Sequence, residues 1–312
     1  MSVAPLRPRA SAAACLAESG RRDCEFCHGE DIVTYPGEAF AVAETCRHLR
    51  NCSTCQGSGF LRDVDKDGYE IMRRCGFAAI ARRAQRFNEM NLPARFHDMR
   101  LASYEARGGN GNNQSQMRAI VEQLRDRLID EQRPDHSVAP GVRGLGLSGA
   151  PGVGKTHLLC ALARELTIDQ DMTVRYADFS TLLWDLKSRF DQGSGEGALL
   201  APLIDADVLI LDEVGKGKAN EWDISIIDAL VAGRYNRRKT IIFATNYPFE
   251  GVNISDFNSA AKFGRGGVQI ETLRDRVHDR VFSRLCEMCD LVTVVGPDAR
   301  KIASTESGRG GR

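Results

Sequence analysis

The clearest chemical signature in the sequence is a glycine-rich loop. The run GAPGVGKT has the spacing GxxxxGK[ST] and stands between a short apolar strand and a helical segment at residues 157–166. Glycines let successive backbone amides turn inward on phosphate oxygens at a helix N-terminus. Lys155 would reach the β- and γ-phosphates, and the Thr156 hydroxyl would ligate Mg²⁺. The residues expected to line this nucleotide site are Gly149, Ala150, Pro151, Gly152, Val153, Gly154, Lys155, Thr156 and His157.

Two polar strand ends follow this loop in the chain. The apolar run VLIL leads into Asp212 and Glu213, and the run TIIFAT leads into Asn246. We interpret Asp212 as the carboxylate on the Mg²⁺ side and Glu213 as the base that polarises the attacking water. The Asn246 carboxamide would hold the water or the γ-phosphate. Since an open α/β sheet binds ligands at the carboxyl ends of its strands, all three side chains should lie near Lys155.

Cysteines at the start of the chain indicate a second kind of chemistry. Seven of the ten precede residue 76, and their spacing repeats: a CxxC pair, about 20 residues, then a further Cys. We interpret this as a tandem unit of CxxC knuckle, short β-hairpin and second knuckle that holds structural zinc. The predicted ligands are Cys24, Cys27, Cys46, His48, Cys52, Cys55 and Cys75.

The pairing of these ligands remains open at this point. The first unit offers three thiolates and one imidazole, whereas in the second Phe77 stands where a fourth ligand would be. Two zinc ions would therefore require the second site to borrow His28 or Cys15. A single site from the two CxxC pairs would leave Cys46 and Cys75 as spares, and a reduced, metal-free loop is the remaining alternative. A complete ligand set leaves no open position for catalysis.

The segments between these motifs predict the fold. Strands are expected at residues 173–176, 207–212, 240–245 and 291–295, and helices at 117–129, 179–190 and 224–235. Alternating strands and helices predict an α/β fold with a mainly parallel sheet.

A helix rich in arginine is expected from residue 271 onward. Leu273, Val277, Val281 and Leu285 form one apolar stripe, and Arg276, Arg280 and Arg284 lie beside it. These arginines either form a solvated face or supply an arginine finger to a neighbouring subunit. Cys286 and Cys289 are expected to be buried core thiols.

Charge and hydropathy exclude several classes of protein. The chain has 312 residues with 42 basic and 42 acidic side chains, so it is neither a globally basic nucleic-acid binder nor an acidic tail protein. Seven arginines against two acids in residues 73–100 give a local charge of +5, suited to DNA or an acidic partner. With no long apolar run and no export signal, we expect a cytoplasmic protein that does not enter membranes.

These motifs together resemble the AAA+ ATPases of the DnaC-type helicase-loader and IstB-type transposition-helper group. The resemblance rests on GAPGVGKTHLLCALA, VLILDEVGKG, RYNRRKTIIFATNYP, RVHDRVFSRLCEMCDLV and GPDAR, with CSTCQGSG and NLPARFHDMRLASY upstream. It implies that Asn246 is the first sensor, Arg284 the arginine finger with Arg280 as the alternative, and Arg300 a second-sensor residue that contacts nucleotide. The first cysteine unit looks like an addition to the single knuckle of the group, and the short tail leaves no room for a full helical lid.

The resemblance implies an ATP-hydrolysing switch that oligomerises and binds single-stranded DNA and a replicative helicase during DNA replication. The alternatives are a transposition helper on duplex DNA and a zinc-module protein-binding adaptor regulated by ATP. The expected organisation is a flexible N-terminus (1–23), a zinc-knuckle module (24–80), a basic helix and linker (81–116), an AAA+ domain (117–303) and a disordered tail (304–312).

Overall fold

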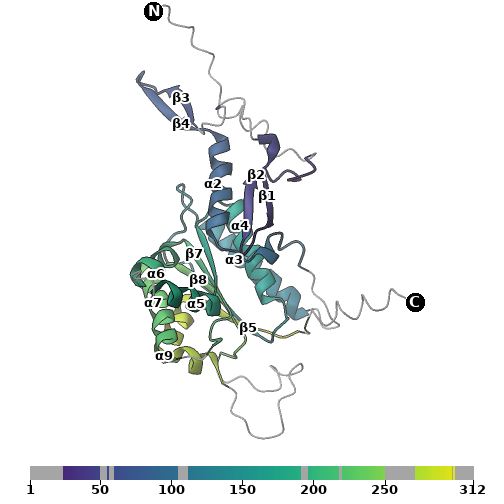
Figure 1. Ribbon diagram of the computed structural model, residues 1–312, viewed down its shortest axis with the longest axis vertical. Coiled ribbons are helices and arrows are strands. Elements are labelled where there is room, and N and C mark those ends of the chain that lie inside the picture. Colours follow the sequence, from purple (N-terminus) through teal and green to yellow (C-terminus); the bar gives the residue numbers. More distant parts are fainter. Residues whose placement is uncertain are drawn as a thin grey trace, which may run out of the picture. The chain divides into compact units, whose positions relative to one another are not determined.

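The computed structural model describes residues 24–49, 55, 60–104, 112–190, 196–217, 220–249, 271–296 and 298 (Figure 1). Two compact units make up the chain. The first, here the N-terminal unit, comprises residues up to Glu89 together with Pro93–His97. The second, here the ATPase unit, comprises Met90–Leu92 and the residues from Asp98 onward.

The ATPase unit is built on a five-stranded sheet of strand order β6-β7-β8-β5-β9. Every neighbouring pair is parallel. The strands are β5 (Gly144–Gly149), β6 (Val174–Asp178), β7 (Val208–Asp212), β8 (Thr240–Thr245) and β9 (Cys289–Val294). Parallel sheets need cover on both faces, which explains why β5, β7 and β8 are buried at every position.

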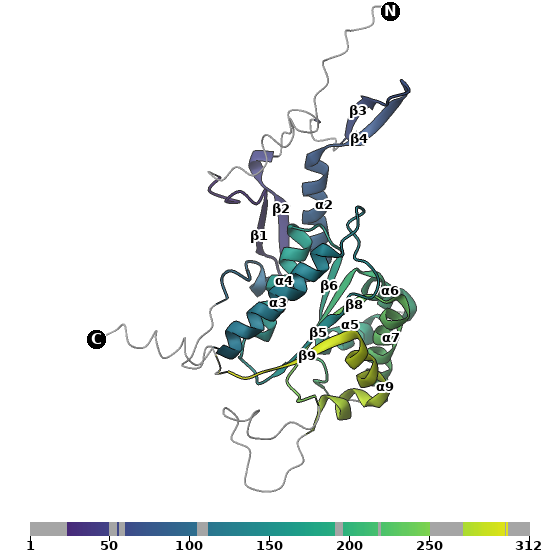
Figure 2. The same ribbon diagram turned by 180° about the vertical axis from the view of Figure 1, so that it is seen from behind.

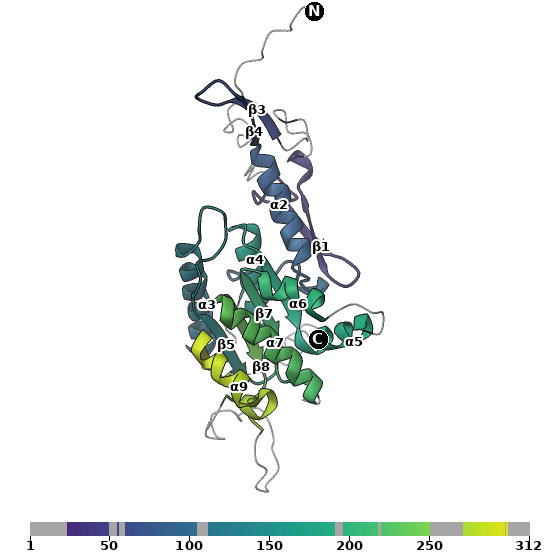
Figure 3. The same cartoon turned by 90° about the vertical axis from the view of Figure 1, so that its left-hand side faces the viewer.

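Helices cover both faces of this sheet (Figures 1 and 2). Helices α3 (Asn112–Asp130) and α4 (Lys155–Ile168) contact each other and lie on one face. The other face carries α5 (Phe179–Phe190), α6 (Glu196–Asp205), α7 (Glu221–Arg237) and α9 (Leu273–Met288). Figure 3 shows α7 lying across β7 and β8, and Leu209 and Phe243 of these strands join its apolar residues in one core.

The α/β class with a parallel sheet is therefore confirmed, while the element boundaries shift by a few residues. The strand expected at 173–176 spans Val174–Asp178, and the helix expected from 224 begins at Glu221. The asparagines and glutamine placed in the linker at 112–114 form the first turn of α3 instead, because a polar stretch can begin a helix whose apolar positions follow.

Within residues 24–49 and 60–89, the N-terminal unit contains two hairpins and the helix α2. β1 (Ile32–Pro36) pairs with β2 (Ala41–Thr45), and β3 (Phe60–Val64) pairs with β4 (Glu70–Arg74), both antiparallel. The predicted hairpin between the two knuckles of each unit is thus confirmed. Short 3-10 turns follow at η1 (Arg47–Leu49) and η2 (Ala94–Phe96).

Helix α2 (Gly76–Glu89) is the basic helix expected between the two halves, and it packs on β2. Its Asn88 side chain bonds both backbone groups of Ala43, accepting from the amide at 2.6 Å and donating to the carbonyl at 3.0 Å. Arg82, Arg83 and Arg86 of this helix are half-buried.

Several predicted features fall on residues that lie outside the described ranges: residues 1–23 and 304–312, most of the 105–115 linker, the 251–267 loop, Cys15, Cys52 and Arg300. No helix within the described ranges is both long and apolar enough to cross a membrane.

Candidate functional site

The glycine-rich loop has the backbone that a phosphate cradle requires. It begins at the end of β5, and α4 starts at Lys155. Gly152 and Gly154 have φ angles of 86° and 98°, a region that costs other residues energy because of their Cβ atoms. The strand–loop–helix context predicted from the sequence is confirmed.

The Lys155 ammonium lies in a pocket made of oxygen atoms. It donates to the carbonyls of Gly149 and Ala150 at 2.6 and 3.0 Å and to Oδ1 of Asn246 at 2.8 Å. Lys155 is buried, and Asn246 directly follows β8, the strand next to β5. The fold therefore brings two of the predicted residues into direct contact across 91 positions of sequence.

A second contact joins the loop to β7. The Thr156 hydroxyl donates to Oδ2 of Asp212 at 2.6 Å, and the Tyr176 hydroxyl donates to the same oxygen at 2.9 Å. Asp212 is buried at the last position of β7, and Tyr176 comes from β6. Burial raises the pKa of Tyr176 far above its usual range, so the phenol stays a hydrogen-bond donor. A hydroxyl and a carboxylate at this distance are suited to share one Mg²⁺.

Glu213 lies beside this pair but is engaged elsewhere. Its backbone adopts φ 55°, and its amide donates to Oδ1 of Asp212 at 2.9 Å. Its carboxylate pairs with the ammonium of Lys216, which is the main cause that raises the pKa of that lysine. The turn that follows β7 at Glu213 is bonded to β8, because the amide of Val214 donates to the carbonyl of Ala244 at 2.9 Å.

The contacts of the His157 ring are with Tyr104 and Arg100. Its ring lies edge-on to that of Tyr104, with centroids 5.3 Å apart, and its Nε2 is 3.4 Å from the carbonyl of Arg100. Tyr104 is buried and its hydroxyl donates to the carbonyl of Val153 at 3.3 Å. Burial lowers the pKa of His157. These contacts tie the segment before residue 105 to the phosphate loop.

The arginines of α9 have partners within the ATPase unit. Arg284 donates to Oδ1 of Asp228 on α7 at 2.8 Å, and Arg280 pairs with the other oxygen of the same carboxylate. Arg276 donates to the carbonyl of Gly215 at 2.8 Å and lies 5.1 Å from the Tyr247 ring. The Arg280 side chain is 72% exposed and that of Arg284 is 28% exposed.

Helix α9 differs from the sequence expectation in two respects. Its apolar stripe is buried as predicted, yet the helix is kinked at His278, where φ is 67° and ψ 158°. Cys289 is buried and donates to the carbonyl of Ile241 at 3.3 Å, whereas Cys286 is exposed. The prediction of two buried thiols was wrong for Cys286, because this position near the end of α9 lies beside the apolar stripe and not in it.

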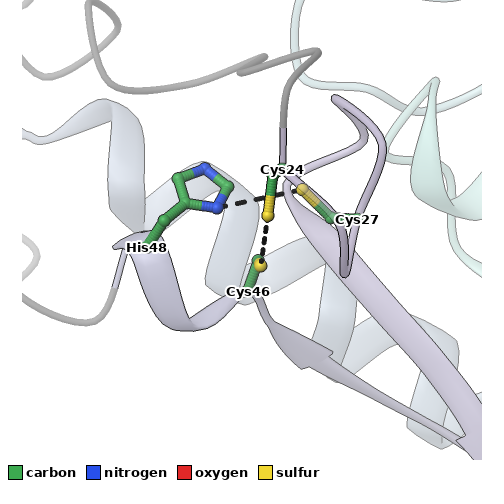
Figure 4. A group of neighbouring side chains, drawn as sticks. All are labelled: Cys24, Cys27, Cys46 and His48. Carbon is green, nitrogen blue, oxygen red and sulfur yellow. Dashed lines mark hydrogen bonds between the residues drawn. The ribbon is translucent and has the colours of Figure 1, made fainter.

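The first cysteine unit converges on one point (Figure 4). One ligand atom each from Cys24, Cys27, Cys46 and His48 lies within 4.8 Å of the others. The sulfurs of Cys24 and Cys46 are 3.5 Å apart, and Nδ1 of His48 is 3.8 Å from the sulfur of Cys27. Hydrogen bonds with the backbone of Cys27 and Phe26 lower the pKa of the Cys24 thiol to about 6, while burial raises that of Cys46 to about 11.

Three thiols and one imidazole at these distances fit a tetrahedral zinc ion. Of the arrangements that the sequence leaves open, the one in which Cys46 is a spare disagrees with this cluster. In the second unit, Cys55 and Cys75 are buried together against Leu61 and Phe77. Phe77 thus packs on the two thiols at the place where the sequence lacks a fourth ligand.

Sequence reasoning missed four residues that contact these sites: Tyr176, Lys216, Asp228 and Asp31. Tyr176 is the middle residue of β6, and nothing in the sequence of this strand marks it as a site residue. Lys216, Asp228 and Asp31 belong to residue types that are common on protein surfaces. Their contacts arise only in the folded chain, so no sequence pattern predicts them.

Comparison with known proteins now gives this arrangement a context. Its fold and site are those of a P-loop α/β nucleotide-binding domain. Residues 138–260 match the model of the family described as IstB-like ATP binding protein. This segment, which contains the phosphate loop, β7 and β8, is therefore similar to an IstB-like ATP-binding domain, as the motifs predict.

Individual relatives cover different shares of the chain. The phage-like element PBSX protein XkdC of Bacillus subtilis (strain 168) is 25% identical over 215 residues, 67% of this chain and 77% of the relative. The replicative helicase loader DnaC of Escherichia coli (strain K12) is 30% identical over 104 residues, 33% of this chain and 42% of that protein. The crystal structure of the DnaC helicase loader aligns with a TM-score of 0.49 at 23% identity, covering 64% of this chain and 99% of that one.

Proposed function

We propose that this protein is an ATP-hydrolysing AAA+ switch that acts as a helicase loader in DNA replication. One observation carries the proposal: Lys155, Thr156, Asp212 and Asn246 meet at the carboxyl ends of three adjacent strands. Lys155 would bind the β- and γ-phosphates, and Thr156 and Asp212 would hold Mg²⁺. Glu213, once released from Lys216, would orient the attacking water.

Hydrolysis is proposed to need a neighbouring subunit, with Arg284 reaching its γ-phosphate. Arg280 and Arg284 share the carboxylate of Asp228, so a subunit interface that draws Asp228 away would free both guanidinium groups. An arginine finger is worth about 10³–10⁵ in rate in related NTPases.

A mixing experiment tests this arrangement. Glu213→Gln subunits lack the base but keep Arg284, while Arg284→Ala subunits keep the base. Each variant alone should be inactive, and a mixture should recover ATP hydrolysis at the mixed interfaces. A mixture as inactive as its components, in oligomers shown to contain both, would contradict the proposal. The same mixture made with Arg280→Ala distinguishes the two arginines.

Single-stranded DNA is the proposed ligand of the ATPase unit. Trp184 on α5 is 70% exposed, and the neighbouring exposed positions of this helix are Thr181 and Lys187. An exposed indole beside a cation can stack on a base of any identity. Fluorescence anisotropy with labelled single-stranded and duplex oligonucleotides, in ATP and in ADP, tests this proposal with Lys155→Ala as the nucleotide control. A preference for duplex DNA would favour the transposition-helper alternative.

A replicative helicase is the proposed partner of the N-terminal unit, which zinc would hold in shape. The second hairpin leaves Phe60, Tyr69 and Met72 exposed, a surface suited to an apolar protein contact. Native mass spectrometry with the purified helicase should detect a complex that Tyr69→Ser and Met72→Ser together weaken. If no complex with the helicase forms, and the intact hairpin instead binds other proteins, the adaptor alternative is favoured.

A further inference from the structure

The imidazole of His48 has two different neighbours. Its Nδ1 points toward the cysteine cluster, 3.8 Å from the sulfur of Cys27 (Figure 4). Its buried Nε2 lies 3.3 Å from Oδ1 of Asp31 but is not aligned for a hydrogen bond with it. The side chains of His48 and Asp31 are 11% and 8% exposed, so this pair is largely shielded from water.

The local backbone conformation places Asp31 beside His48. Asp31 precedes β1 and adopts φ 66°, a left-handed conformation in which aspartate is among the tolerated residues. Its carbonyl accepts from the amide of Cys46 at 2.8 Å, and the next residue, Ile32, pairs with Thr45. The same hairpin that brings Cys46 to the knuckle therefore brings the Asp31 carboxylate to His48, two residues further on.

A buried carboxylate beside an imidazole nitrogen fixes the tautomer of the ring. The proton then resides on the nitrogen that faces the carboxylate, and the other nitrogen keeps its lone pair for a metal ion. Here the nitrogen that faces the carboxylate is Nε2 and the one that faces the sulfurs is Nδ1.

We propose that Asp31 is a positioning residue that holds His48 as an Nδ1 ligand of a zinc ion whose other ligands are Cys24, Cys27 and Cys46. This assignment rests on the zinc centre proposed above and adds to it the ligating atom and the residue that selects it. Asp31 does not touch the ion. With the ion bound, a small turn of the ring would let Asp31 accept the Nε2 proton, hold the ring in place and make Nδ1 a stronger donor.

The test compares zinc affinity in the full-length protein by competition with a chromophoric chelator. Asp31→Ala should weaken zinc binding about 10- to 100-fold, the usual effect of losing an outer-sphere partner. Asp31→Asn keeps an acceptor oxygen of the same shape and should lose less. Asp67→Asn, at an exposed position of the same unit, serves as the matched control and should bind zinc like the wild type.

A spectroscopic readout on the wild-type protein separates positioning from folding. ¹⁵N NMR of the histidine ring with zinc bound should show a protonated Nε2 and a metal-bound Nδ1 for His48. A metal-bound Nε2, or an Asp31→Ala variant with unchanged affinity, would overturn the role of Asp31 while leaving the zinc centre in place. A wild-type protein that binds no zinc would overturn the centre itself, and the assignment with it.

Discussion

The two compact units of this chain are stabilised in different ways. In the ATPase unit, three strands are buried at every position, and four helices share one apolar core with two of them, β7 and β8. In the N-terminal unit, β4 is exposed at all five positions and β3 at alternate ones. A unit of fewer than about 100 residues that leaves a hairpin uncovered buries little apolar surface. We propose that a zinc ion held by Cys24, Cys27, Cys46 and His48 would supply the stability that this small core lacks.

Of the changes considered, removal of zinc should affect the folding of the two units most differently. Structural zinc contributes about 10–16 kcal/mol of apparent binding energy in small domains, enough to decide whether the N-terminal unit folds. With a strong chelator, we expect amide NMR signals of β1 and β2 to collapse to unfolded positions. Both tryptophans of the sequence, Trp184 and Trp222, lie in the ATPase unit, so their fluorescence reports on that unit alone.

The tryptophan unfolding curve in urea should therefore be the same with and without chelator. Cys286→Ser removes an exposed thiol that is not part of the cluster and serves as the control for chelator side effects. Parallel loss of both units on chelation would mean that the ATPase unit also depends on the metal.

The ATPase unit should instead be sensitive to loss of a buried arginine. Arg234 on α7 is fully buried, and its guanidinium donates to five backbone carbonyls at the C-terminus of α6 and the starts of β7 and β8. Arg234→Leu would leave these buried oxygens without donors, and we expect a loss of at least about 3 kcal/mol in the free energy of unfolding.

Urea unfolding followed by tryptophan fluorescence measures this loss. Arg237→Leu removes an arginine that is 53% exposed on the same helix, and should change stability by less than about 0.5 kcal/mol. Equal effects of the two substitutions would show that burial of Arg234 contributes nothing. Zinc affinity should stay unchanged in both variants.

In the ATPase unit, the sequence predicted the motif residues better than it predicted the side chains that contact them. Lys155, Asp212 and Asn246 were found because each ends a strand or begins a helix in a pattern with fixed spacing. The partners Tyr176, Asp228 and Lys216 were not found, because any strand or helix of this composition can carry them. The cluster of Cys24, Cys27, Cys46 and His48 shows the same limit. The CxxC and CxH spacing marked these side chains as candidate ligands, but only the hairpin register showed that they meet and that Asp31 lies beside them.

A smaller effect is expected from substitution of Trp184, which tests whether the ATPase unit or the N-terminal unit binds DNA. Base stacking on an exposed aromatic is worth about 1–3 kcal/mol, so Trp184→Ala should weaken single-stranded DNA binding by roughly 5- to 150-fold. Trp184→Phe keeps an aromatic face and should recover most of the affinity. Tyr69 in the N-terminal unit is equally exposed, and Tyr69→Ala should leave DNA affinity unchanged if the ATPase unit alone binds DNA.

The smallest expected effect is a pH dependence of the ATPase unit through His157. Burial lowers the pKa of His157 below its ordinary value of 6.5. The unfolded chain therefore takes up a proton below about pH 6.5 that the folded chain does not, and stability falls as the pH falls through that value toward the folded pKa. His157→Gln should flatten this part of the profile in urea unfolding measured by tryptophan fluorescence. His278→Asn, at an exposed position with a left-handed backbone that asparagine tolerates, should keep the wild-type slope. A slope that survives in His157→Gln would assign the pH dependence to the carboxylates of the unit instead.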